Sequence, residues 1–170
     1  MSISTVALIL LIPVLIWRIY QRLKSRMTRQ RSILSRHYTG LLVFAGMVLV
    51  PLIDMLDRPL SLGALALGAL AGIALGNHGV RKTRFEDTPD GYYFTPPMRM
   101  GILVAMLLVA RVIYLGIEIY MSQGSGKPIP RFSDSEITLF CVGLTGAYFA
   151  TFSASLVRWR QRLRKAVDNI

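Results

Sequence analysis

Long apolar blocks separated by short polar segments run along the whole chain. The five blocks cover residues 3–20, 40–56, 60–77, 101–120 and 137–157. Each approaches the ~20 residues that a helix needs to cross a bilayer. Apolar residues occupy every helical face of these blocks, so a water-soluble bundle would expose a very large apolar surface. The pattern therefore predicts an all-α protein: a polytopic membrane bundle of five transmembrane helices that forms one domain over residues 1–170.

Basic residues distinguish the two sides of this predicted bundle. Seven lie at the end of the first block or after it, four lie between the third and fourth blocks and five follow the fifth, whereas the two alternate connections hold three. Because Lys and Arg are enriched on the cytoplasmic side of membrane proteins, we expect the N-terminus outside, the C-terminus in the cytoplasm and residues 79–99 in a cytoplasmic loop. The net charge of +11 then reflects topology and contact with anionic lipid headgroups, and no nucleic-acid partner is expected.

The segment after the first block has two interpretations. No basic residue precedes the block and no small-residue cleavage site follows it, so we expect it to remain as an anchor rather than to be removed as a signal peptide. Beyond it, one helical face continues through Ile19, Leu23, Met27, Gln30 and Leu34. Either this helix runs on along the headgroup region, or the basic residues act only as a topology determinant.

The two outer connections are predicted to join antiparallel helix hairpins. Segments 40–52 and 101–113 can be aligned, which predicts a parallel repeat of the two hairpins. "SDSE", residues 133–136, has the spacing of a capping box at the start of the fifth helix. Cys141 is the one cysteine, which excludes an intramolecular disulfide.

Small residues recur every four positions along the third block. They are Ala64, Gly68, Gly72 and Gly76, and a similar series follows in the fifth block at Gly146, Ala150 and Ala154. Small side chains at this spacing let another helix backbone approach closely. The face in the third block predicts either packing inside the bundle or the seam of a homodimer.

The cytoplasmic loop carries a polar and aromatic insert, "RFEDTPDGYYFT". Residues 84–86 and 92–95 are predicted to pair as a short β-hairpin, with a type I turn at Pro89-Asp90 and a positive φ at Gly91. We expect the aromatic residues to rest on the membrane interface or on the bundle, and Pro96-Pro97 to start the fourth helix. The hairpin is either a stiff spacer or a docking edge for a partner. Its candidate residues are Arg84, Phe85, Glu86, Asp90, Gly91, Tyr92 and Tyr93.

The order of these features resembles the CcdC-like family of small bacterial membrane proteins, which is associated with cytochrome c biogenesis. The resemblance rests on "TRFE", a short turn ending in glycine, "YYFTP" and a following span with an intramembrane arginine, over about residues 68–115. It implies a multi-pass protein of the bacterial inner membrane. No catalytic residue is carried over from the family.

An arginine lies in the middle of the fourth block. A charge at this depth costs from about 3 kcal/mol on insertion scales to over 10 in simulations, so Arg111 is expected to face the bundle interior. Tyr114 and Glu118 follow on a similar helical face, and Asp54 lies near the outer end of the second block. These four residues form either a polar pathway or anion site, or a structural cluster of ion pairs and hydrogen bonds.

Signs of catalysis and cofactor binding are sparse. His37 and His78 fall near the cytoplasmic ends of neighbouring helices, and a pair of histidines can ligate haem or a metal. No further ligand accompanies them, so we predict no cofactor and no metal. The sequence contains no nucleotide-binding loop, zinc-protease motif or nucleophile elbow.

Three functions remain open on the sequence. The first is a non-catalytic inner-membrane protein that binds or assists a partner through its cytoplasmic face. The second is a small transporter or channel with Arg111 at the substrate or ion step, and the third is an enzyme that acts on a lipid-borne substrate.

Overall fold

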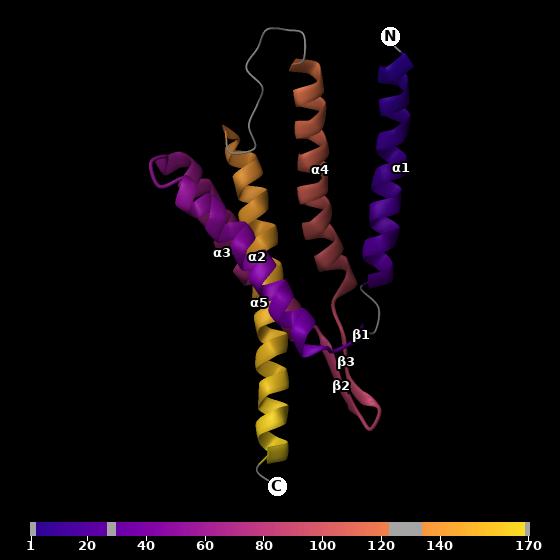
Figure 1. Ribbon diagram of the computed structural model, residues 1–170, viewed down its shortest axis with the longest axis vertical. Helices are drawn as coiled ribbons and strands as arrows, with labels where there is room; N and C mark the ends of the chain where they lie inside the picture. The colour runs from indigo at the N-terminus through magenta and orange to yellow at the C-terminus, as the bar shows by residue number, and fades with distance from the viewer. Residues whose placement is uncertain (1–2, 27–29, 123–133, 169–170) are drawn as a thin grey trace.

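Five helices and a small sheet make up the protein (Figure 1). The computed structural model describes residues 3–26, 30–122 and 134–168. The helices are α1 Ile3–Arg26, α2 Leu34–Asp54, α3 Pro59–Arg81, α4 Met98–Ser122 and α5 Glu136–Asp168. The strands are β1 Gln30–Arg31, β2 Arg84–Thr88 and β3 Gly91–Thr95. The predicted all-α class is therefore confirmed.

Four of these helices, α2 to α5, are long and apolar enough to cross a membrane. Large apolar side chains on α2, α3 and α4 point away from the bundle, such as Leu42 at 75% exposure and Leu67 at 64%. An outer surface of this kind suits lipid rather than water. The chain is accordingly a multi-pass membrane protein, while the membrane crossing of α1 stays a prediction.

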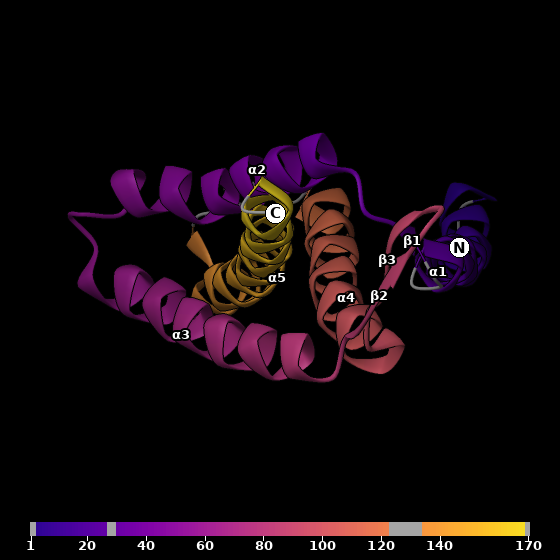
Figure 2. The ribbon, with the colours of Figure 1, turned by 90° about the horizontal axis from the view of Figure 1, so that it is seen from below.

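Helix α5 is the centre of the bundle. Figure 2 shows α5 lying between α2 and α3, with α4 on a further side. The predicted helix hairpin of α2 and α3 is correct in connectivity, but the two helices barely touch because α5 separates them. The pair α4 and α5 packs directly, so the two hairpins of the proposed repeat are not packed alike.

Glycines bring the α3 and α5 backbones into direct contact. A Cβ atom on Gly68 would meet the Phe140 carbonyl, and one on Gly72 would lie 2.9 Å from the Tyr148 amide nitrogen. Gly143 of α5 returns the contact, since its Cβ would lie 2.9 Å from the Ala69 nitrogen. The small-residue face therefore packs within the chain, and a homodimer would need another face of α3.

Side chains fill the bundle above and below this contact. One buried cluster joins Met55, Leu65, Leu139 and Val142, and a second joins Val104, Leu144 and Tyr148. On the opposite side of α5, Gly146 faces α2, where its Cβ would lie 3.0 Å from the Phe44 carbonyl. The core thus follows α5, and α2, α3 and α4 each contribute one face to it.

The polar insert forms the predicted hairpin and gains a third strand. β2 and β3 pair antiparallel from Arg84↔Thr95 to Thr88↔Gly91, and β1 pairs with β3 on its other side. The first arm extends two residues further than predicted, to Thr88. Gly91 has a φ of +133°, as its place after the turn requires. In the strand order β1-β3-β2, the central strand β3 pairs with its hairpin partner β2 and with β1, which is distant from both in sequence.

Two helix ends differ from expectation. Of the two interpretations of the segment after the first block, the helix that runs on through Gln30 is wrong, because α1 ends at Arg26 and Gln30 lies in β1. The third helix runs to Arg81 rather than ending near Asn77, because Gly79 stays helical and packs beside the Tyr148 hydroxyl group. The main-chain oxygen of Gly79 accepts a hydrogen bond from Thr83 Oγ1 at 3.0 Å.

The starts of the last two helices follow local chemistry. α4 begins directly after Pro96-Pro97, as predicted. α5 begins at Glu136, and the Leu139 amide donates to the Ser135 carbonyl at 3.1 Å, so Ser135 rather than Ser133 holds the N-cap position. Ser133 itself lies outside the described residues.

The backbone contact between α3 and α5 predicts a sharp difference between glycines. Gly72→Ala should lower the free energy of unfolding by about 1–3 kcal/mol, because the added methyl group overlaps the α5 backbone. Gly63→Ala is the matched control, since nothing lies within 4 Å of its Cβ position and alanine favours the helix by about 0.5–1 kcal/mol. Thermal unfolding in detergent measures both, and equal effects would contradict the contact.

Candidate functional site

Arg111 reaches from α4 to the first turn of α5. Its Nε donates to Thr138 Oγ1 at 2.8 Å and one terminal nitrogen donates to Ser135 Oγ at 2.7 Å. The guanidinium also lies 4.9 Å from the ring centre of Tyr114, a distance typical of a cation–π contact. Both hydrogen-bond acceptors are neutral, so these bonds fix the position of the guanidinium without neutralising its charge.

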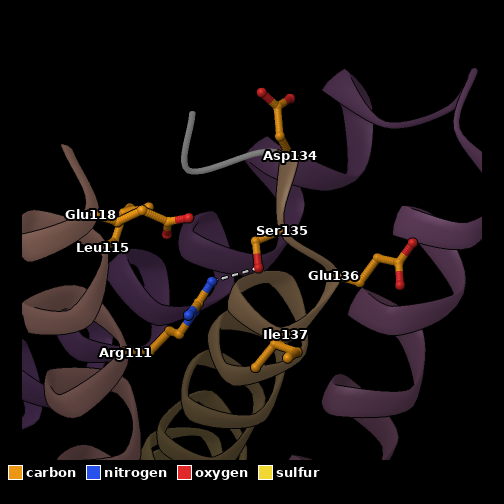
Figure 3. A pocket seen from close by; sticks show the side chains of 7 residues that line it. All are labelled: Arg111, Leu115, Glu118, Asp134, Ser135, Glu136 and Ile137. Carbon is orange, nitrogen blue, oxygen red and sulfur yellow. Dashed lines mark hydrogen bonds between the residues drawn. The ribbon is translucent and has the colours of Figure 1, made fainter. Parts of the chain in front are cut away.

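A pocket of about 350 Å³ opens beside this arginine. Figure 3 shows Arg111 and Glu118 projecting from α4, with Ser135 and Ile137 on the facing end of α5. The full lining is Arg111, Leu115, Glu118, Asp134, Ser135, Glu136 and Ile137. We call it the Arg111 recess.

The recess exists because α5 begins level with the middle of α4. From Arg111, α4 continues to Ser122, a rise of about 16 Å at 1.5 Å per residue. Figure 1 shows α4 reaching beyond the start of α5. Polar backbone and side chains at the start of α5 therefore lie at the depth of a central α4 residue, which is tolerated where they line a cavity.

The predicted polar cluster is brought together only in part. Tyr114 and Glu118 lie beside Arg111, whereas Asp54 does not line the recess. Arg111 and Glu118, both described, form no ion pair with each other. The sequence predicts only a helix cap at "SDSE", and it does not indicate that the polar start of α5 lies beside Arg111. Its Asp134 pairs with Arg58 of the α2–α3 turn at 3.1 Å.

The bundle is packed beneath Arg111. Thr138, which binds Arg111, has 0% exposure. Further along the bundle, Val104 of α4 is buried against Leu144 and Tyr148 of α5, and Thr145 Oγ1 donates to the Val104 carbonyl at 3.4 Å. The described residues between α4 and α5 beneath Arg111 are therefore buried.

A second candidate site lies at the opposite end, where the sheet meets the long C-terminal part of α5. Phe85 of β2 lies 4.7 Å from Trp159, and Tyr92 of β3 meets the same indole at 6.1 Å with its ring perpendicular. The guanidinium of Arg160 stacks on Tyr92 at 3.8 Å. We call the sheet and these α5 residues the platform.

The platform is also tied to the start of α2. Phe94 packs 5.5 Å from His37 and 6.4 Å from Phe152. His37 Nε2 and Ser32 Oγ are joined by a hydrogen bond of 2.9 Å, and the Ser32 amide donates to the Tyr92 carbonyl at 2.8 Å. The predicted aromatic contacts therefore fall on the bundle, and they hold the hairpin against α2 and α5.

The histidines occupy different environments. His37 is buried in the platform, while His78 is exposed near the end of α3. Within the described ranges, no group of three or more His, Cys, Asp or Glu side chains is arranged to hold a metal ion. The absence of a metal or haem at these residues stays a prediction.

A family model described as CcdC protein matches residues 1–166. The chain belongs to the CcdC protein family. No curated protein and no solved structure matches it.

For this CcdC family member, the match extends well beyond the motifs that carried the resemblance. It includes α1, the platform and the Arg111 recess. The family description assigns no residue to a task, so the two candidate sites must be judged by their geometry.

The open recess predicts a difference in thiol accessibility. Ser135→Cys in the CcdC family chain should react with a water-soluble maleimide about tenfold faster than the native Cys141, which is 8% exposed and lies within α5. Wild-type protein provides the control because Cys141 is its one thiol. Labelling of Ser135→Cys no faster than this background would show that water does not reach Arg111.

Proposed function

We propose that the protein is a non-catalytic inner-membrane protein that binds or assists a protein partner through its cytoplasmic face. The observation that carries the proposal is the platform. Two-stranded hairpins are marginally stable alone in water, yet this hairpin is paired with β1 and packed on Trp159, Arg160 and His37. A rigidly held sheet is a suitable docking surface because little ordering entropy is lost on binding.

The charge of the same end supports a cytoplasmic position. Figure 1 shows the sheet, the end of α1 and the end of α5 together at one end of the molecule. Because Lys and Arg are enriched on the cytoplasmic side of membrane proteins, the basic residues at this end favour its placement in the cytoplasm. They also favour contact with anionic lipid headgroups and with an acidic partner surface. Exposed examples are Arg36, Arg81, Lys82, Arg84, Arg158, Arg162, Arg164 and Lys165.

The partner surface itself is formed by residues that the bundle does not use. Arg84, Asp87 and Asp90 are exposed on β2 and its turn. Tyr92, in contrast, is held between Trp159 and Arg160. Substitution of Tyr92 would therefore disturb the support of the platform, whereas β2 and its turn can be altered without loss of that support.

A transporter or channel receives less support. Transport or conduction requires a path through the bundle, and the described residues beneath Arg111, such as Thr138 and Val104, are buried. A homodimer remains compatible with the proposal through a face of α3 other than its glycines.

Crosslinking tests the docking surface directly. A photo-reactive amino acid at Asp87 or Asp90 should give a discrete crosslinked partner in cells, and Trp159→Ala should weaken that crosslink because the sheet loses its support. The same probe at Asp57, exposed in the turn between α2 and α3, is the control and should give none. Equal crosslinking at both ends, or no loss in Trp159→Ala, would refute the platform as the docking site.

Orientation has its own test. A reporter that works only in the cytoplasm should be active when it is fused at Asp90 or at the C-terminus. A reporter that works only outside should be active when it is fused at Asp57, because basic segments resist translocation. The opposite result would place the platform outside the cell and remove a cytoplasmic partner.

A further inference from the structure

The Arg111 recess separates its charges by depth. Arg111 lies at the base, and Glu118 follows seven residues later on the same helix, about 10 Å nearer the open end. Glu136 lies at its edge on α5, but Figure 3 shows the Glu136 carboxylate turned away from Arg111 and Glu118. The base is thus positive and the rim negative.

The contacts of these groups within the protein leave both a positive and a negative charge available to a ligand. Asp134 is engaged by Arg58. Arg111 is bound by the hydroxyl groups of Ser135 and Thr138. Within the described ranges, neither Glu118 nor Glu136 forms an ion pair with a basic side chain. A buried or half-buried charge favours a partner of opposite sign. This arrangement therefore points to a ligand that carries both a negative and a positive group.

The chemical class follows from the order of the charges. A simple anion would pass the Glu118 carboxylate before it reached Arg111, and a simple cation would be repelled by Arg111 at the base. We infer that the recess binds a zwitterion, whose anionic group is held by Arg111 and Ser135 and whose ammonium group is held by Glu118. A guanidinium matches a phosphate by charge-assisted hydrogen bonds, and an ammonium group donates to carboxylates in the same way.

The surroundings favour a phosphoethanolamine group. Leu115 and Ile137 line the recess. Ile137 is 66% exposed and the neighbouring Val112 48%, so the polar pocket adjoins a lipid-facing apolar surface. A lipid can place its headgroup in such a recess and its acyl chains along that surface. A free zwitterion has the same charges without the chains. The recess and the platform lie at opposite ends of the molecule, so this inference does not depend on the proposed function.

Lipid retention provides the main test. Protein is purified into detergent, exchanged into phosphatidylethanolamine or phosphatidylglycerol, and analysed by native mass spectrometry for retained lipid. We expect wild type to retain phosphatidylethanolamine about tenfold more strongly, the effect of one charge-assisted interaction of about 1.4 kcal/mol. Equal retention of the two lipids would overturn the inference.

Variants locate the binding. Glu118→Gln should abolish the preference for phosphatidylethanolamine, and Ser135→Ala should weaken it while sparing the fold. Asp54→Asn is the matched control, because Asp54 is exposed and does not line the recess. An unchanged preference in Glu118→Gln, or equal losses in Asp54→Asn, would refute the site.

A competition experiment identifies the source of the ligand. Soluble phosphoethanolamine is added to protein that has been loaded with phosphatidylethanolamine. Displacement at millimolar concentration would support binding of a free zwitterion, whereas retention of the lipid would support a membrane headgroup whose chains add affinity. Both results require the preference to depend on Glu118.

Discussion

The close approach of the α3 and α5 backbones is the contact on which the rest of the bundle depends. Without a strong hydrophobic drive between helices in lipid, association relies on van der Waals packing. Glycines at 68 and 72 of α3 and at 143 of α5 let each backbone enter the surface of the other. This contact places α5 between α2 and α3, and the position of α5 then fixes the depth of everything attached to its two ends.

The length and offset of α5 connect the two candidate sites. Its N-terminus stops level with Arg111, which creates the recess, and its 33 residues continue far enough to carry Trp159 and Arg160 under the sheet. A hydrogen bond of 2.8 Å from Gln161 to the Tyr38 hydroxyl group joins the same region to α2. One rigid helix therefore sets both the shape of the Arg111 recess and the position of the sheet at the opposite end of the bundle.

Periodic features could be predicted from the sequence, and contacts between distant segments could not. Apolar blocks gave the helices, and Pro89, Asp90 and Gly91 gave the hairpin turn, because these signals are local. The strand at Gln30–Arg31 exists because β3 offers it a pairing edge, and two polar residues carry no strand signal of their own. The role of Ser135 and Thr138 depends on the vertical offset of α4 and α5, which is a property of packing.

The partners of Arg111 distinguish a structural charge from an available one. A purely structural arginine in a membrane bundle is most stable when a carboxylate neutralises it and both are buried from lipid. Here the nearby carboxylate of Glu118 forms no ion pair with it, although both described residues line the same pocket. The hydroxyl groups of Ser135 and Thr138 satisfy two donors and lock the guanidinium in place. Its net charge is left to water or to a ligand, which explains why the pocket must stay open to one side.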